Sequence, residues 1–241
     1  MSDYNIVADL HCHTIACTHA YSTITELANA AAGLGLAALG YTEHGIAMVG
    51  APQLWHFTNL KDLPDYISGV RVLRGAEVNV IGFDGQLDME NETLEDLEVV
   101  IASMHGGLMP KGNVEQCTAA WLAVSENPNI DIIGHSGSPE YAYDYEAVLP
   151  AMAKSGKAIE LNEHSFEVRK SSIDNCRRIA LLCKQYKVPI VVNSDSHHHA
   201  SVGFFPNCIQ MLSELDFPPE LIINSSVQNM NLFFSKKGIR L

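Results

Sequence analysis

The chain has 241 residues, of which 47% are hydrophobic, so it is long and apolar enough to bury a sizeable core. Its 28 acidic residues outnumber its 15 basic residues and give a formal net charge of -13. A surface this acidic repels nucleic acids and anionic membranes, and we therefore expect neither as a partner.

Strand-like and helical segments alternate along the chain. Apolar runs typical of buried strands cover residues 6–11, 37–42, 70–76, 99–104, 130–134, 158–161 and 189–193. Helical patterns cover residues 25–34, 114–125, 145–154, 172–186 and 208–215. We also expect a hairpin around residues 82–85, and a short strand followed by a helix within residues 220–236.

Repeated strand–helix units favour a parallel sheet that is covered by helices. About seven such units close most simply into a TIM-like barrel, which gives an α/β fold. The sequence contains no low-complexity segment, short repeat or linker, so residues 1–241 are predicted to form a single domain.

Six of the seven predicted strands end on a residue type that commonly binds metals. A barrel places all the C-terminal strand ends on one rim, where the active sites of this architecture lie. Alternate side chains of a strand share a face, so His11 points the same way as His13, and Asp195 the same way as His197. Together with His19 on the first loop, the candidate ligands are His11, His13, His19, His44, Glu77, His105, His135, Asp195 and His197. Mixed imidazole and carboxylate ligands suit zinc, manganese or iron better than magnesium or calcium.

Several nearby residues are interpreted differently. Cys12 has the opposite parity to His11, and Cys17 has no partner cysteine, so neither is included among the ligands. Asp9 either orients an imidazole or has a structural role, and Glu43 either supports its neighbour His44 or faces solvent. The remaining histidines are expected to be solvated loop residues: His56, His164, His198 and His199.

Cysteine spacing and hydropathy bear on the compartment. The six cysteines show no C-x-x-C motif and no disulfide-like spacing, which favours reduced thiols in a cytoplasmic protein. No apolar run is long enough to span a membrane, and the N-terminus carries no pattern of a secretory signal. We therefore expect a cytoplasmic protein.

Six ordered motifs resemble the PHP (polymerase and histidinol phosphatase) family, and most of all its bacterial YcdX-like phosphatase subgroup. They are Asp-Leu-His-Cys-His at 9–13, Thr-Glu-His at 42–44, Gly-Ala-Glu at 75–77, Ser-Met-His at 103–105, Gly-His-Ser at 134–136 and Asn-Ser-Asp-Ser-His at 193–197. The resemblance covers nearly the whole chain. It implies that residues 1–241 form a PHP metal-dependent phosphoesterase domain, a distorted (β/α)7 barrel that holds three divalent metal ions. Zinc is the first expectation for these ions, with manganese or iron as alternatives.

The resemblance also implies roles for single residues. It places His11, His13, Glu77 and Asp195 on one metal ion, and it lets Glu77 bridge to a second ion that also takes His105 and His135. The third ion takes His19, His44 and His197. Glu77 and Asp195 are assigned as the catalytic residues. One departure is Glu43, because many members of the family have Asp at this position.

Clustered divalent ions suit the attack of a metal-bound hydroxide on phosphorus, because one ion lowers the pKa of its water to about 7 while a neighbour stabilises the phosphate oxygens. We therefore expect a phosphatase that hydrolyses monoesters of small phosphorylated molecules. The sequence has no G-x-S-x-G nucleophile motif. Arg169 and Lys111 lie on loops at the expected rim, where each either contacts phosphate or is an ordinary solvated charge.

Other interpretations stay open. A histidinol phosphatase, or a phosphodiesterase of the exonuclease type, would keep the metal chemistry and change the substrate. A catalytically inert metal-binding scaffold is the alternative of another class, and fully ligated ions would favour it. A homo-oligomer is also left open.

Overall fold

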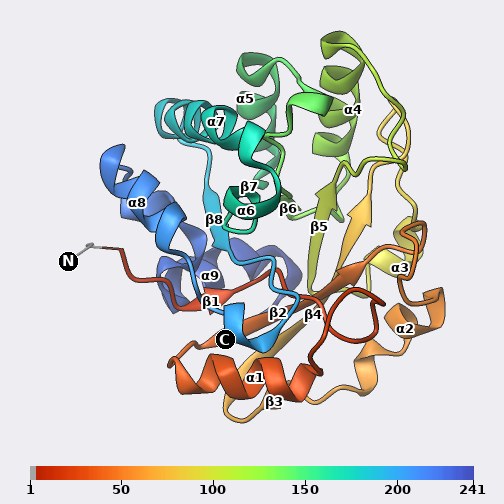
Figure 1. The fold of residues 1–241 in the computed structure, drawn as a ribbon, viewed down its shortest axis with the longest axis vertical. Helices are drawn as coiled ribbons and strands as arrows, with labels where there is room; N and C mark the ends of the chain where they lie inside the picture. Colours follow the sequence, from red (N-terminus) through yellow and green to blue (C-terminus); the bar gives the residue numbers. More distant parts are fainter. Residues whose placement is uncertain (1–3) are drawn as a thin grey trace.

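The structure is a computed structural model that describes residues 4–241. Within these residues, seven parallel strands form one sheet in the order β1-β2-β4-β5-β6-β7-β8 (Figure 1). Their bounds are Ala8–Asp9 (β1), Ala38–His44 (β2), Val70–Asn79 (β4), Val99–Ser103 (β5), Ile132–Ile133 (β6), Ala158–Asn162 (β7) and Ile190–Asn193 (β8). A two-residue strand, β3 (Tyr66–Ile67), pairs with β4 in the antiparallel direction.

The sheet curls until its two edge strands come close. Beyond the ends of β1 and β8, the backbone N–H of His13 donates to the carbonyl of Ser196 at 2.8 Å, and the N–H of Ser196 donates to the carbonyl of His11 at 3.3 Å. The side-chain oxygen of Asn193 accepts a hydrogen bond from the backbone N–H of Leu10 at 2.9 Å. The parallel sheet is thus a nearly closed barrel, which confirms the predicted α/β barrel fold.

Helices cover the outside of the barrel. They are α1 (Ile24–Gly33), α2 (Leu54–Thr58), α3 (Asn91–Leu94), α4 (Val114–Glu126), α5 (Tyr145–Ser155), α6 (Ser165–Val168), α7 (Ile173–Tyr186), α8 (Pro206–Glu214) and α9 (Val227–Phe233). Figure 1 shows α4, α5 and α7 at the top of the barrel in this view and α1 at the bottom. Local sequence explains where helices begin: Thr23 and Glu26 form a capping box at the start of α1.

The inward-facing side chains change from apolar to polar along the strands. One buried apolar cluster includes Leu73, Ile101 and Val191 of the strands, together with Met230 and Phe234 of the tail. Further along the same strands, toward their C-terminal ends, the residues of matching parity are polar and buried: Glu77, Asn79, Ser103, Asn193. Alternation along each strand therefore gathers a polar layer at one end of the barrel.

Some predicted elements differ from the structure. The expected strand in the tail is wrong, because residues 219–225 form two short 3₁₀ helices with a single bridge between Ile190 and Ile222. The first strand is shorter than predicted: it covers Ala8–Asp9, and beyond it an isolated bridge joins Cys12 to Ser196. The short elements α2, α3, β3 and α6 were not predicted, because each is too short to show the hydrophobic periodicity of a helix or a strand. At the expected hairpin, an antiparallel bridge joins Val80 to Leu87.

Of the helices within residues 4–241, none is both long and apolar enough to cross a membrane.

Candidate metal centre

Glu77 lies at the centre of the polar end of the barrel, with imidazoles around both of its carboxylate oxygens. Its Oε2 lies 2.7 Å from His44 Nδ1, 3.3 Å from His11 Nε2 and 3.5 Å from His13 Nε2. Its Oε1 lies 2.9 Å from His135 Nε2 and 3.4 Å from His105 Nε2. The two oxygens of one buried carboxylate therefore face two separate groups of histidines.

Asp195 joins the first of these groups. Its Oδ1 lies 3.2 Å from His13 Nε2 and 3.6 Å from His11 Nε2. The two imidazole Nε2 atoms of His11 and His13 are themselves 3.1 Å apart. Three side chains from the segments that follow β1 and β8 thus direct their ligand atoms at a common point, as their parity predicts.

His19, His44 and His197 form an outer group of predicted ligands, and His44 also approaches Glu77 at the centre. His19 Nε2 lies 3.1 Å from His44 Nε2, so the two nitrogens of His44 face different neighbours. The ring of His197 lies 5.0 Å from that of His19 and 4.5 Å from that of His13. All nine predicted ligand side chains therefore converge on the polar end of the barrel.

Several atoms of this cluster are buried without a hydrogen-bond partner. Those that face the other ligand atoms are His44 Nδ1, Glu77 Oε2, His105 Nε2 and Asp195 Oδ1. His44 Nδ1 and Glu77 Oε2 approach each other without the alignment of a hydrogen bond. Unpartnered buried polar atoms are costly, and a cation between converging lone pairs would remove that cost. The donor set of neutral imidazoles and carboxylates therefore fits divalent transition-metal ions.

Electrostatics supports the same interpretation. Burial opposes the charge of His11, but the carboxylates of Glu160, Glu77 and Asp195 outweigh it and raise the pKa of His11 well above its usual value. Burial and the neighbouring imidazole of His44 hold the pKa of His13 well below its usual value. Burial also opposes the charge of Glu77, yet the surrounding histidines keep the pKa of this carboxyl well below its usual range. Without a metal ion, a proton on His11 therefore partly takes the place of a cation.

Two of the converging residues have a left-handed backbone. The φ angle is 24° at His135 and 56° at Asp195. Residues other than glycine rarely adopt such angles, and they persist where the surroundings impose them, most often at functional sites. The backbone turn sets the direction in which each of these side chains leaves its strand.

Glu160 of β7 supports the metal centre, although the sequence analysis did not identify it as a site residue. Its Oε1 accepts hydrogen bonds from His11 Nδ1 at 2.7 Å and from the Asn193 side chain at 2.9 Å. Its Oε2 accepts one from the backbone N–H of His135 at 2.9 Å. These bonds fix the His11 ring with Nε2 toward the cluster. The available signal was a carboxylate inside the apolar run 158–161.

We predict that Glu160→Gln lowers the affinity for zinc by about 10- to 100-fold, because glutamine loses the negative charge and one of the two acceptor oxygens that bond to His11 and His135. Titration calorimetry of the metal-free protein measures this effect. Glu163→Gln is the matched control, because Glu163 is also buried but accepts hydrogen bonds from the backbone N–H groups of Asn207 and Cys208. Equal losses of zinc affinity in the two variants would contradict a positioning role for Glu160.

The structure decides between the alternatives for Asp9 and Glu43. The carboxylate of Asp9 accepts hydrogen bonds from the N–H and hydroxyl of Ser194 and from the N–H of Gly203, so its role is structural. Glu43 is buried rather than facing solvent. One oxygen of Glu43 accepts from the N–H and hydroxyl of Thr14, and the other lies 3.9 Å from His13 Nδ1.

The two cysteines of the first loop differ. Cys12 packs in an apolar cluster with α1, as its parity predicts. The ligand atom of Cys17 lies within 4.8 Å of those of His19 and His44. Burial raises the pKa of the Cys17 thiol to about 12. This shift applies to the thiol without a metal ion, and a bound cation would itself favour the thiolate, so its position makes Cys17 a further candidate ligand beside His19 and His44.

Two of the four histidines expected to be solvated are partly buried. The ring of His164 stacks on that of His197 with 5.6 Å between centroids. His56 packs against Tyr41, and its Nε2 is buried without a partner. His198 and His199 are exposed, as predicted.

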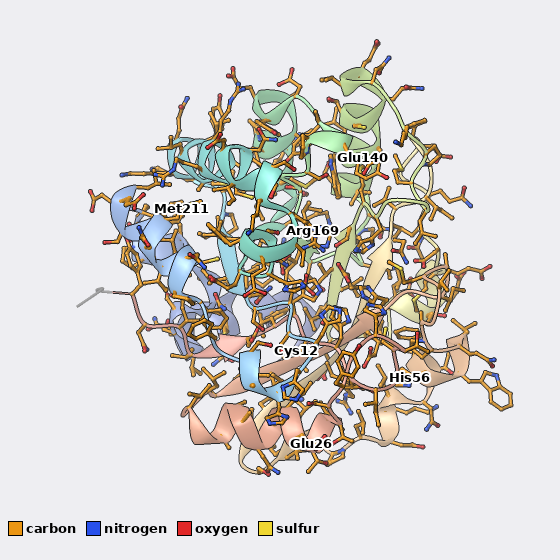
Figure 2. The ribbon with its side chains drawn as sticks, viewed as in Figure 1. Cys12, Glu26, His56, Glu140, Arg169 and Met211 are labelled. Carbon is orange, nitrogen blue, oxygen red and sulfur yellow. The ribbon has the colours of Figure 1, made fainter. Side chains whose placement is uncertain are left out.

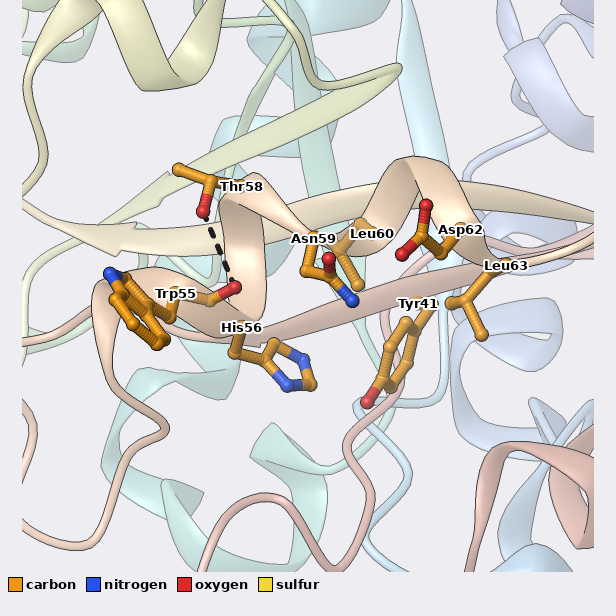
Figure 3. A pocket seen from close by; sticks show the side chains of 8 residues that line it. All are labelled: Tyr41, Trp55, His56, Thr58, Asn59, Leu60, Asp62 and Leu63. Carbon is orange, nitrogen blue, oxygen red and sulfur yellow. Dashed lines mark hydrogen bonds between the residues drawn. The ribbon is translucent and has the colours of Figure 1, made fainter.

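Two cavities are relevant to ligand binding. A cavity of about 630 Å³, lined by Tyr41, Trp55 and His56 among others, lies against β2 and α2 and contains none of the predicted metal ligands (Figure 3). A smaller cavity of about 300 Å³ includes Asp195 and His197 in its lining.

The two basic residues considered for phosphate binding separate in the structure. Arg169 Nη1 lies 3.4 Å from Asp195 Oδ2, beside the centre (Figure 2). Lys111 is largely exposed and pairs with Glu140 at 3.5 Å. Arg169 is therefore the one of the two that reaches the cluster.

Comparisons with known proteins agree with this geometry. A family model described as the PHP domain matches residues 9–164. The chain is 43% identical to a probable phosphatase of Acetivibrio thermocellus, over 98% of each protein. It is 42% identical to a probable phosphatase of Clostridium novyi, over 96% of each.

Solved structures show the same fold. A histidinol phosphate phosphatase from Lactococcus lactis, complexed with zinc, L-histidinol and phosphate, is similar with a TM-score of 0.60 and 17% identity. The alignment covers 88% of this chain and 94% of that protein.

Proposed function

Because the chain belongs to the PHP domain family, we propose that it is a metal-dependent phosphatase that hydrolyses phosphate monoesters of small molecules. The observation that carries this proposal is the buried carboxylate of Glu77, whose two oxygens face separate groups of imidazoles. Such a carboxylate suits the space between two cations, because its negative charge offsets both. We assign the whole of residues 1–241 to one catalytic domain.

We propose that three divalent ions bind here. His11, His13, Glu77 and Asp195 would hold the first ion, and Glu77 would share the second with His105 and His135. His19, His44 and His197 would hold the third. The imidazole-rich donor set favours zinc, with manganese or iron as alternatives. The zinc in the Lactococcus lactis protein supports this choice. Bound divalent ions would supply Lewis acidity, which activates a water and stabilises charge on the phosphoryl oxygens.

The chain's own residues would position the substrate. Asp195 Oδ2 accepts a hydrogen bond from Asn162 Nδ2 at 3.2 Å, which leaves Oδ1 directed into the cluster. Arg169 reaches the same carboxylate through one Nη, so the rest of its planar guanidinium remains available to a phosphate oxygen. Glu77 and Asp195 are the catalytic residues of this proposal.

The experiment that tests the proposal is hydrolysis of p-nitrophenyl phosphate with added Zn²⁺ or Mn²⁺. We expect turnover that depends on the metal. A protein that binds its metals and releases no phosphate, from this ester or from a panel of phosphorylated metabolites, would instead be the inert scaffold. The net charge of -13 opposes binding of long nucleic acids, which makes an exonuclease the weaker alternative.

We predict that the affinity for zinc falls as the pH is lowered from 8 to 6. Metal binding must displace the proton that Glu160, Glu77 and Asp195 stabilise on His11, whose pKa is raised. Below that raised pKa the proton competes with the metal, so lower pH weakens binding. Competition with a chelator at several pH values measures the effect, and an affinity independent of pH would contradict it.

A further inference from the structure

Two hydrogen bonds in series lead from the candidate metal centre to a carboxylate outside it. His105 Nδ1 lies 2.7 Å from the side-chain oxygen of Asn79, the last residue of β4. Asn79 Nδ2 in turn donates to Asp88 Oδ2 at 2.6 Å. Asn79 is fully buried, and Asp88 is partly buried just after the bridge between Val80 and Leu87. Neither Asn79 nor Asp88 is among the nine predicted metal ligands.

The carboxylate of Asp88 fixes which way the amide of Asn79 points. A carboxylate accepts hydrogen bonds and donates none, so the NH₂ group of Asn79 faces Asp88 and the amide oxygen faces His105. Asp88 Oδ1 also accepts from the backbone N–H of Asn79 at 2.8 Å. The backbone N–H of Asp88 donates to the carbonyl of Asn79 at 3.0 Å. Three hydrogen bonds between the two residues therefore hold the amide in one orientation.

The orientation of the amide sets the tautomer of His105. An amide oxygen accepts a hydrogen bond but cannot donate one, so the proton of a neutral His105 ring resides on Nδ1. Nε2 then carries the lone pair. This atom lies 3.4 Å from Glu77 Oε1 and is buried without a hydrogen-bond partner. The imidazole thus presents a lone pair to the point where we placed the second metal ion.

Asp88 also holds the segment that follows His44. Its Oδ2 accepts a hydrogen bond from the backbone N–H of Ala47 at 2.9 Å. A Cβ atom on Gly45 would lie 2.5 Å from both carboxylate oxygens, so this close approach requires a glycine at position 45. A loss of zinc affinity on removal of Asp88 could therefore come from either contact, and the test must separate them.

From these contacts we propose that Asp88 and Asn79 are positioning residues of the metal centre, which hold His105 in the tautomer that can bind the second ion. Asp88 acts through Asn79, and neither residue would touch a metal ion or the substrate. The carboxylate of Glu160 supports His11 directly, whereas here an amide stands between the carboxylate and the imidazole. This inference rests on the proposed phosphatase function, because it concerns an ion that the proposed centre would hold.

The tautomer of His105 can be measured in the metal-free protein, independently of activity. Nitrogen-15 NMR of the histidine rings distinguishes a protonated Nδ1 from an unprotonated one, and comparison with His105→Gln identifies the signals of this ring. At mildly alkaline pH we expect a protonated Nδ1 in the unchanged protein. Asp88→Ala frees the amide of Asn79 to turn over and present N–H to the ring. We expect part of the His105 population in this variant to carry its proton on Nε2 instead.

Zinc binding and a second substitution separate the two contacts of Asp88. Asp88→Ala should lower the affinity for the second zinc ion by about 10- to 100-fold. Adding Asn79→Asp to this variant restores the net charge, and a carboxylate at position 79 presents an acceptor to His105 whichever way it turns. The double variant should therefore regain both the Nδ1 proton and the zinc affinity. The contact with Ala47 would stay lost, so a purely structural role of Asp88 predicts no recovery.

Asp131→Ala is the matched control. Asp131 Oδ2 accepts from the backbone N–H of Val100 at 2.8 Å, near the start of the strand β5 that leads to His105. Its removal deletes a carboxylate that braces the backbone but has no contact with the amide of Asn79. We expect it to leave the tautomer of His105 and the zinc affinity unchanged.

Failure of the inference is distinguishable from failure of the proposed function. An unprotonated Nδ1 in the metal-free protein would overturn the positioning role. So would a double variant that binds zinc no better than Asp88→Ala, whether or not phosphate esters are hydrolysed. If the tautomer and the recovery are as expected but no ester is hydrolysed, the positioning role stands and the phosphatase proposal fails.

Discussion

Replacing Glu77 with glutamine is expected to release at least one metal ion and to lower kcat by about 10³-fold. Glutamine keeps the shape of the side chain but loses the negative charge that faces five imidazole nitrogens. The amide group would also direct N–H donors at atoms that must present lone pairs to a cation. Loss of several kcal/mol of transition-state stabilisation corresponds to this fall in rate. Elemental analysis and steady-state kinetics on the same preparation measure both effects.

Two other variants make this test selective. Arg169→Gln should raise KM and leave the metal content unchanged, because Arg169 contacts Asp195 Oδ2 rather than the converging atoms. His199→Ala should be nearly silent, because His199 is exposed and bonds to Ser22. Full metal content and near-normal turnover in Glu77→Gln, with an inactive His199→Ala, would show that the ligand assignment is wrong.

Removing the metal ions is expected to abolish activity and to lower the melting temperature by about 5–10 °C. A ligand present at about 100 times its dissociation constant stabilises the folded state by about 2.7 kcal/mol. For a chain of this size, each kcal/mol corresponds to about 2–4 °C. Metal removal would leave the buried, unpartnered atoms of His44, Glu77 and Asp195 without a cation. Thermal unfolding before and after dialysis against a chelator measures the shift.

Adding back zinc should restore both the activity and the melting temperature, with a plateau near three ions per chain. A plateau at one ion per chain after saturation would contradict the trinuclear proposal. Activity and stability that survive complete removal of the metals would contradict the metal dependence itself.

Local patterns were sufficient for the order of the strands and for the position of the cluster. Each long apolar run predicted a strand. The polar residue at its end was predicted to lie on the rim, because the parallel strands of a barrel end on the same side. Shorter sequence patterns were not sufficient to predict the local secondary structure. The strand expected in the tail became 3₁₀ turns, since Asn224 bonds to Ala8 and Val192 through its side chain and no sheet partner extends the bridge at Ile222.

The sequence by itself determined the barrel and the convergence of the candidate ligands, because strand period and strand direction are local properties. Only the tertiary structure decided which oxygen of Glu77 faces which imidazole and which carboxylate holds the ring of His11. Those relations join residues far apart in the chain, and they are set when the barrel closes between β1 and β8.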